Sequence, residues 1–291
     1  MPIYGWDMSH FDAPGIGDAV AEGFVFLTHK AGGDKDDAEI GAWWNGVKGL
    51  GAGVLLGAYW VLYPGNPSGR ADTFLARLDA TCPGWRNRPF ILQVDCEKWG
   101  GNASTVPSKS EIKAFCDRLV AKCPKLRPIV YAPEWVYGDK LSGLGYPLWA
   151  SAYVSGSGSA KSLYPGDGSS KWAAYSGQTP AVLQFTSSAT IAGQTTCDAN
   201  AYRGTLAQLT ALVAPGWKDD PEMTEAEMDL LAGKIAAALL KSDTVPVTPA
   251  SGVSTTWMTQ TAIGDMTTKL GEISRNIAQV VKNTTPLPPT A

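Results

Sequence analysis

The sequence predicts an α/β fold in which parallel strands close into a barrel, followed by a small α-helical C-terminal region. Apolar runs rich in β-branched residues alternate along the chain with helical patterns. These runs are almost continuously hydrophobic, which is typical of parallel strands covered on both faces. Of the 291 residues, 44% are hydrophobic and 18% are charged, so the chain can bury a large core.

Strands and helices alternate through the first half of the chain. A short apolar strand is expected at residues 3–8, and Ser108 with Glu111 has the pattern of a capping box that opens a helix. Further helical stripes fall between the other strands. Repeated alternation of this kind favours a parallel barrel. The remaining buried strands of this half are expected at 23–30, 54–63, 90–97 and 128–133.

The pattern changes after about residue 147. Three strands are expected at 148–154, 181–187 and 195–199, joined by Gly/Ser-rich loops without room for a full helix. A last helix is expected at 203–213. Turn residues then mark a boundary, so residues 1–217 are predicted to form one domain.

The remaining residues have a different composition. An amphipathic helix is expected at 218–243, a Pro/Ser/Thr linker at 244–255, a heptad-patterned helix at 256–283 and a disordered tail at 284–291. The heptad pattern spans only about two and a half repeats. It therefore leaves two alternatives open, a homo-oligomer formed through 256–283 or docking of this helix on its own chain.

Charge and cysteine content exclude several kinds of partner. Residues 1–217 hold 18 Lys and Arg against 18 Asp and Glu, which argues against nucleic acid as a partner. The five Cys form neither a CxxC pair nor a Cys/His zinc pattern, so buried free thiols are expected and neither a metal nor a cofactor.

The sequence shows no membrane-targeting pattern. Its N-terminus lacks the basic and apolar regions of a signal peptide, and no apolar run approaches the roughly 18–20 residues of a membrane span. We therefore expect synthesis in the cytoplasm without an export signal, and no stable membrane insertion.

Two acidic residues end the most hydrophobic strand. Asp95 and Glu97 are two residues apart, so they are expected on the same side of the strand, at the carboxyl end where barrel enzymes place their active sites. Two acids so close cannot both ionise freely, and one pKa should rise towards the value of a general acid. A salt-bridged structural pair is the alternative.

Asp7 and Asp198 end two other predicted strands. Either one alone could equally be a turn or helix-cap residue. All the acids, however, lie at strand ends on the same predicted rim of the barrel. This coincidence makes them candidate catalytic residues.

In order along the chain, several motifs together resemble the lysozymes (N-acetylmuramidases) of glycoside hydrolase family 25, especially phage endolysins. The resemblance covers about residues 3–213 and implies a flattened, TIM-like barrel of five β/α units followed by three strands. The motifs that carry it are Gly5-x-Asp7-x-Ser9-His10, Phe24-Val25-Phe26, Lys30-Ala31, Gly57-Ala58-Tyr59, Asp95-x-Glu97, Leu148-Trp149-Ala150, Leu183-Gln184-Phe185 and Asp198-x-Asn200.

The resemblance implies hydrolysis of the β-1,4 bond from N-acetylmuramic acid to N-acetylglucosamine in bacterial peptidoglycan. Glu97 matches the proton donor, and Asp95 matches a partner that orients the substrate acetamido group or a water. Asp7 and Asp198 match acids that stabilise positive charge at the anomeric carbon. A retaining, inverting or acetamido-assisted route stays open.

Aromatic and amide residues near the strand ends are candidates for binding the sugar, because pyranose rings pack on aromatic faces. Trp99 and Tyr153 also lie near strand ends. The sequence departs from the family pattern at Gly32-Gly33, at Trp60, where a His is common, and at Leu183, where a Trp is common. The predicted substrate-binding residues are Tyr59, Trp60, Tyr131, Trp149, Gln184 and Asn200.

Two other functions remain open at this stage, a non-catalytic glycan-binding barrel and a chitinase-like hydrolase. Retention of all four acids argues against the first. The residues before Asp95 lack the fuller chitinase acidic motif, which argues against the second. By analogy with phage lysins, the protein would accumulate in the host bacterial cytoplasm and act on the cell wall.

Overall fold

The computed structural model describes residues 1–12 and 15–217. The chain divides into two units, Met1–Lys218 and Asp219–Ala291. The helices, linker and tail that we expect at 218–243, 244–255, 256–283 and 284–291 lie outside the described residues.

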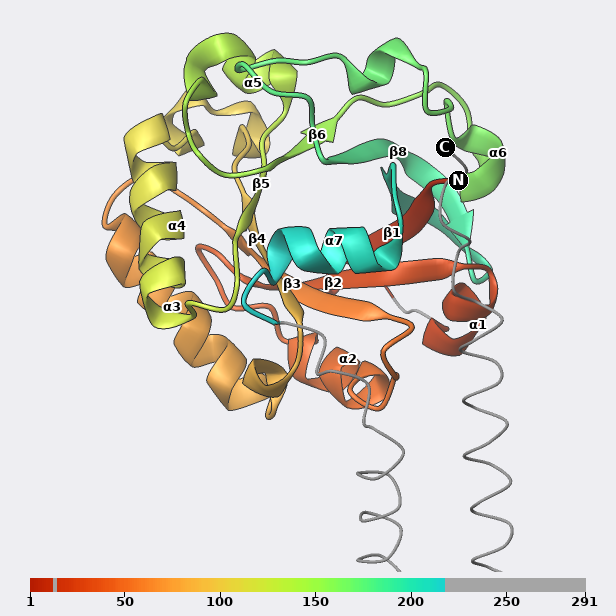
Figure 1. Cartoon of the computed structure of the whole chain (residues 1–291), viewed down its shortest axis with the longest axis horizontal. Coiled ribbons are helices and arrows are strands. Elements are labelled where there is room, and N and C mark those ends of the chain that lie inside the picture. The colour runs from red at the N-terminus through yellow and green to blue at the C-terminus, as the bar shows by residue number, and fades with distance from the viewer. Residues whose placement is uncertain (13–14, 218–291) are drawn as a thin grey trace, which may run out of the picture. The chain divides into compact units, whose positions relative to one another are not determined.

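Eight strands of the first unit form a closed barrel (Figure 1). Strands β1 to β6 run parallel in sequence order, β6 pairs with β8, and β9 closes the ring by pairing antiparallel with both β8 and β1. The short β7 adds to the edge of β8. The strands are β1 (Ile3–Met8), β2 (Phe24–Gly32), β3 (Leu55–Val61), β4 (Phe90–Asp95), β5 (Ile129–Tyr131), β6 (Leu148–Ser151), β7 (Gly158–Ser159), β8 (Val182–Ile191) and β9 (Gln194–Tyr202).

A helix follows each of the first five strands, and these helices surround the barrel in Figure 1. The prediction of five β/α units followed by three barrel strands is therefore confirmed. The α-helices are α1 (Ile16–Ala21), α2 (Ile40–Val47), α3 (Pro67–Thr81), α4 (Lys109–Lys122), α5 (Glu134–Tyr137), α6 (Ala160–Leu163) and α7 (Leu206–Val213). Single 3-10 turns lie at Trp85–Asn87, Trp99–Gly101, Ala103–Thr105, Gly138–Leu141 and Ser170–Trp172.

Local sequence signals fix the ends of the long helices. Ser108 and Glu111 form the predicted capping box at the start of α4. At α3 the Asn66 side chain accepts a hydrogen bond from the Gly69 N–H, and Pro67 occupies the first helical turn, where its missing N–H is harmless.

Several strand boundaries differ from the prediction by two residues or more, among them those of β4 and β8. Strand β4 ends at Asp95 and not at residue 97, so Glu97 lies in the loop beyond it. Strand β8 continues to Ile191, beyond residue 187, because its polar second half pairs with β9 and β7. Antiparallel pairing with β9 accommodates the polar side chains of this half.

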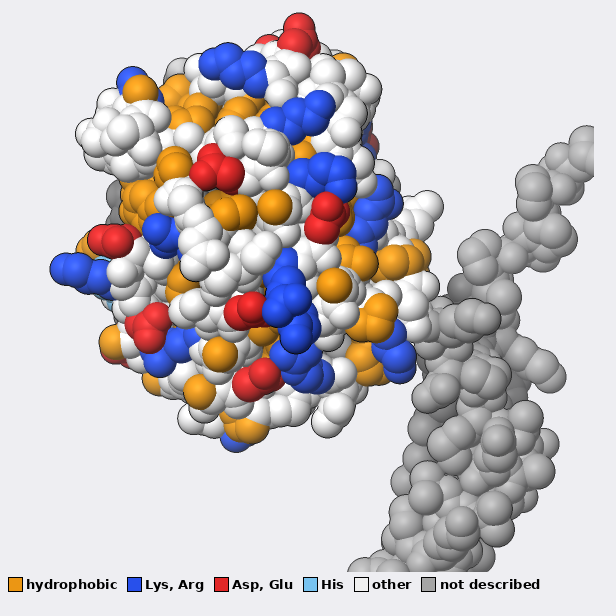
Figure 2. Space-filling model, turned by 90° about the vertical axis from the view of Figure 1, so that its left-hand side faces the viewer, with side chains coloured by type: hydrophobic (Ala, Val, Ile, Leu, Met, Phe, Trp, Pro, Cys, Tyr) orange, Lys and Arg blue, Asp and Glu red, His pale blue; other side chains and the backbone are white. Residues whose placement is uncertain are grey.

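The core lies inside the barrel and between the barrel and its helices. Phe74 of α3 stacks on Phe115 of α4, and Trp44 of α2 packs edge-on against Phe90 of β4. The five Cys are buried and free, as expected. On the molecular face shown in Figure 2, Lys and Arg side chains are interspersed with Asp and Glu.

Helix α7 packs at the amino end of the parallel strands. The Arg127 N–H, just before β5, donates to the Val213 carbonyl (2.7 Å), and the Gly216 N–H donates to the Lys125 carbonyl (3.1 Å). Because this end is covered, the carboxyl ends of the strands are left as the place for a site.

Substitution of Gly57 measures how tightly adjacent strands pack. In Gly57→Ala the new Cβ would lie 2.4 Å from the Ile91 Cβ and 2.6 Å from the Ile91 carbonyl oxygen, both on the neighbouring strand. We expect this change to lower the free energy of unfolding by about 2 kcal/mol or more. Gly46→Ala is the matched control, because nothing lies within 4 Å of its new Cβ in α2 and alanine favours a helix by up to about 1 kcal/mol. Urea unfolding of both variants measures the difference, and equal stability of the two would contradict the tight packing.

Candidate active site

Asp7 and Asp198 face each other across the pair that closes the barrel. They are partners in the antiparallel register of β1 and β9. Asp7 is the last residue but one of β1, which places both carboxyl groups at the carboxyl end of the parallel strands. Residues nearly 200 positions apart are therefore neighbours here.

Asp95 ends β4 on the same rim. Its register partners are Val61 of β3 and Tyr131 of β5. The next residue still follows the sheet, since the Cys96 N–H donates to the Tyr131 carbonyl (2.9 Å). This bond holds the start of the loop that carries Glu97, two residues beyond Asp95.

Burial and mutual repulsion shift the proton affinity of these acids upwards. Burial raises the pKa of Glu97 to about 7; the Asp7 charge acts in the same direction and the Lys30 ammonium lowers it. Burial raises the pKa of Asp198 to about 9, with further contributions from Asp7, Asp12 and Glu97. These interactions show that the acids from the first, fourth and last barrel strands share one electrostatic environment.

Asp95 and Asp7 differ in how far hydrogen bonds stabilise their ionised forms. Burial and the charges of Glu97 and Asp7 raise the pKa of Asp95 well above its ordinary value, and Asp95 Oδ1 is buried without a hydrogen-bond partner among the described residues. Burial raises the pKa of Asp7 only to about 6, because hydrogen bonds from Asn200 and Gln184 stabilise its charged form. At neutral pH Asp7 is therefore the most fully ionised acid of the cluster, and Glu97, with a pKa of about 7, is only partly ionised.

Two buried amides hold the Asp7 carboxylate. Asn200 Nδ2 donates to Asp7 Oδ1, and Gln184 Nε2 donates to both oxygens, at 3.0 and 3.2 Å. Asn200 Oδ1 accepts from the Trp149 indole N–H (2.8 Å). Because an indole can only donate, this contact fixes the orientation of the amide and turns its NH₂ group towards Asp7.

Tyrosine hydroxyls orient the second amide. Gln184 Oε1 accepts from Tyr131 Oη (2.8 Å) and from Tyr153 Oη (2.6 Å). Tyr131 is buried and Tyr153 is 43% exposed, so the chain of hydrogen bonds leads from the surface to Asp7. The sequence pointed to Tyr153 only as an aromatic residue near a strand end.

The predicted substrate-binding residues separate into groups by position. The half-buried Tyr59 lies among the acids, since Asp7, Asp95 and Asp198 all raise the pKa of its hydroxyl, after burial. Gln184, Asn200 and Trp149 are almost completely buried and position Asp7 instead of presenting a surface to a ligand.

The prediction that Trp60 binds the substrate is wrong. Its side chain is 2% exposed and packs against Phe74 of α3, outside the barrel. A Cβ on Gly32 would lie 2.7 Å from the Trp60 ring, so Gly32 leaves room for it. No face of this indole is open to a sugar, and we remove Trp60 from the candidate site.

The sequence reasoning gave no role to Lys30. Its ammonium lowers the pKa of both Asp95 and Glu97, and it lies 5.0 Å from the centre of the Trp99 ring. Lys30 could have been predicted, because it is a cationic residue near the end of a buried strand, on the side where the acids were expected.

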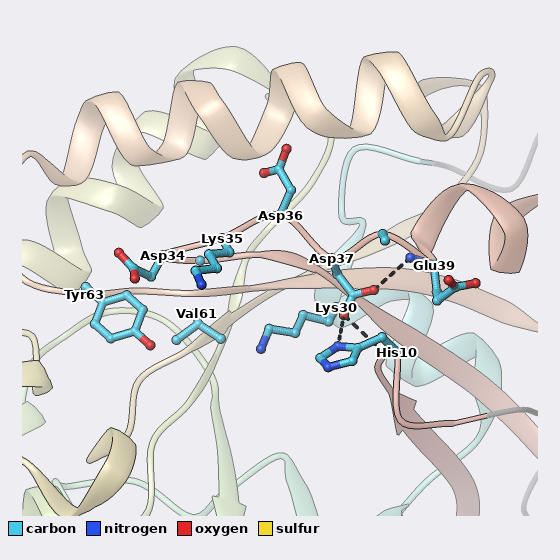
Figure 3. A pocket seen from close by; sticks show the side chains of 11 residues that line it. His10, Lys30, Asp34, Lys35, Asp36, Asp37, Glu39, Val61 and Tyr63 are labelled. Carbon is cyan, nitrogen blue, oxygen red and sulfur yellow. Dashed lines mark hydrogen bonds and ion pairs between the residues drawn. The ribbon is translucent and has the colours of Figure 1, made fainter.

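An open pocket of about 620 Å³ has residues of β2 and β3 in its lining (Figure 3). Lys30 and Val61 line it, and Val61 is the register partner of Asp95. The rest of its lining comes from His10 after β1, from the loop between β2 and α2, and from Tyr63 after β3. The pocket therefore opens at the carboxyl end of the barrel.

In residues 1–12 and 15–217, no group of three or more His, Cys, Asp or Glu side chains is arranged to hold a metal ion. Within the same ranges, no helix is both long and apolar enough to span a membrane.

The raised pKa of Asp198 predicts a pH-dependent gain in stability for Asp198→Asn. A carboxyl group with a raised folded-state pKa favours folding while protonated, and this contribution is lost as pH rises from about 4 towards about 9. Asparagine has no proton to lose, so the variant should exceed the native protein in stability by at least about 1 kcal/mol at pH 8 and by less at pH 4. Thermal unfolding at both pH values measures this. Asp18→Asn, at an exposed position of α1, is the control, and an equal gain at both pH values would contradict the prediction.

No protein-family model matches the chain, and no curated protein sequence matches it. Solved structures do match. The bacterial lysozyme of Streptomyces coelicolor has a TM-score of 0.55 at 18% identity, covering 74% of this chain and 98% of that lysozyme. A family GH25 lysozyme from Aspergillus fumigatus has a TM-score of 0.54 at 21% identity, covering 74% and 100%. The CTP1L endolysin has a TM-score of 0.52 at 18% identity, covering 87% and 85%. The chain therefore has the fold of the lysozymes of glycoside hydrolase family 25.

Proposed function

We propose that the protein is a muramidase that hydrolyses the β-1,4 bond between N-acetylmuramic acid and N-acetylglucosamine in bacterial peptidoglycan. The observation that carries this proposal is the convergence of Asp7, Asp95, Glu97 and Asp198 on one rim of the barrel, with the pKa of Glu97 raised to about 7. A carboxyl group with this pKa can hold a proton at neutral pH and still give it up. The fold shared with lysozymes and an endolysin supports the same reaction.

In the proposed reaction Glu97 is the general acid. Its proton passes to the glycosidic oxygen as the bond to the anomeric carbon of the muramic residue breaks, which leaves a free 4-hydroxyl on N-acetylglucosamine. Water then adds to the anomeric carbon and creates a new reducing end on N-acetylmuramic acid. One proton of that water restores the acid.

The other acids act on the muramic residue. The ionised Asp7 stabilises the positive charge that develops at the anomeric carbon, and its two amide donors fix its position. Asp95 ends β4 two residues before Glu97, and its carboxyl group orients the substrate acetamido group. Orienting that group would favour participation of its carbonyl oxygen at the anomeric carbon.

We further propose a role as a phage-type endolysin that is made in the host bacterial cytoplasm and acts on the wall. The endolysin among the proteins of the same fold supports this role. Association through residues 256–283 stays a prediction, because these residues lie outside the described ones.

Product analysis tests the reaction. Mass spectrometry of digested peptidoglycan should show new reducing ends on N-acetylmuramic acid. Reducing ends on N-acetylglucosamine would indicate a glucosaminidase specificity, as in a chitinase-like hydrolase, and unchanged strands would indicate a glycan-binding barrel.

Glu97→Gln should reduce hydrolysis of purified cell walls by about 100-fold or more. The change is isosteric and removes only the acidic proton, so the protein should fold, with an unchanged circular dichroism spectrum. Glu134→Gln, an exposed carboxyl group at the start of α5, is the matched control and should keep full activity. Equal activity of the two variants would exclude Glu97 as the acid.

The pKa values of the cluster predict the pH profile of kcat/KM. Activity should fall above about pH 7, as Glu97 loses its proton, and below about pH 6, as Asp7 gains one. Since the Asp7 charge raises the pKa of Glu97, the residual activity of Asp7→Asn should show its alkaline limb at lower pH. A limb that does not move would show that the two groups are not coupled.

A further inference from the structure

The pocket beside the acids has a lining unlike that expected for a sugar subsite. Two lysines and four acidic residues line it, against one aromatic ring, that of Tyr63. N-acetylated sugar rings carry no charge, so a charged lining matches a different part of a substrate. The lining residues belong to β2, β3 and the segments that follow β1, β2 and β3 (Figure 3).

The wall of the pocket is held in place by Asp37. The Asp37 side chain is completely buried and accepts hydrogen bonds from His10 Nδ1 (2.8 Å) and the Glu39 N–H (3.0 Å). Its backbone is tied as well, since the Asp37 carbonyl accepts from Arg77 Nη2 (2.7 Å) and its N–H donates to the Ala31 carbonyl (3.1 Å). The loop between β2 and α2 is therefore preformed.

Four charged side chains of the lining have no ion pair among the described residues. They are the ammonium groups of Lys30 and Lys35 and the carboxylates of Asp34 and Glu39, whereas Asp37 pairs with His10 and Asp36 with Arg77. In the view of Figure 3, Asp34 lies on the side of Lys35, and Glu39 lies on the opposite side, beyond His10 and Asp37. This arrangement is complementary to a short chain that bears both carboxylates and an amine.

The chemistry of the substrate places such a chain next to this pocket. In peptidoglycan the muramic residue carries a short peptide on the lactyl ether at C3, adjacent to the acetamido group at C2. In the proposed function that acetamido group meets Asp95. Val61, the register partner of Asp95, lines the pocket, so a substituent at C3 leaves the sugar close to the pocket entrance.

We propose that this pocket binds the charged stem peptide of the muramic residue and so makes the protein selective for peptide-bearing glycan. The proposal rests on the proposed muramidase function. Lys35 and Lys30 bind the peptide carboxylates, and one of the two flanking acids, Asp34 or Glu39, binds its amine. The volume of about 620 Å³ lies within the range of about 300–1,000 Å³ typical of small-molecule sites.

Soluble glycan fragments made with and without stem peptides test the proposal. The native protein should hydrolyse the peptide-bearing fragments with a kcat/KM about tenfold higher, the effect of one charge-assisted contact. Lys35→Glu should abolish most of this preference, because it reverses one of the two positive charges. Lys48→Glu, at the C-terminal end of α2 and outside the pocket lining, is the matched control and should keep the preference.

The outcomes separate the two proposals. Equal kcat/KM on both fragments, or a full preference retained in Lys35→Glu, would overturn the peptide pocket while the muramidase function stands. Failure to release reducing N-acetylmuramic acid from either fragment would overturn both. Fragments whose peptide carboxylates are amidated should lose most of the preference with the native protein, and a fully retained preference for them would contradict recognition of the carboxylates by the lysines.

Discussion

The candidate site depends on the hydrogen bonds that Asn200 and Gln184 donate to Asp7. Four carboxyl groups gathered at one end of a barrel repel one another and lose hydration, so each tends to stay protonated. The two amides favour the charged form of Asp7 alone. They thereby distribute charge unevenly within the cluster, with a base at Asp7 and proton-holding groups around it, which is the asymmetry that acid catalysis requires.

Gathering buried acids in one cluster lowers the stability of the folded protein. Buried acids with raised pKa values weaken folding as pH rises, and the barrel tolerates them because its other layers are densely packed with aromatic and branched side chains. The side chains that hold the acids in place are buried as well. Trp149 and Tyr131 are placed where they orient amides, so residues with the appearance of sugar platforms in the sequence serve mainly to keep the acids in place.

The sequence predicted the order of strands and helices well, because each buried strand carries a long apolar run. It also placed the four acids on one rim, since strand ends of a parallel barrel share a face. Alternation along a strand predicts that the adjacent Tyr59 and Trp60 point to opposite faces, but the sequence could not tell which of them faces the acids. Trp60 and Tyr59 are adjacent, yet Tyr59 lies among the acids and Trp60 lies under α3. The departures from the family pattern at Gly32 and Trp60 explain each other only in three dimensions, where the glycine makes room for the indole.

The closure of the barrel by β9 has a consequence during synthesis. Asp7 leaves the ribosome almost 200 residues before its facing partner Asp198 and the amide of Asn200. A nascent chain that has not yet emerged through β9 holds only part of the cluster, and its Asp7 lacks one of its amide donors. The complete cluster of acids, with both amide donors to Asp7, therefore forms only after β9 has been synthesised.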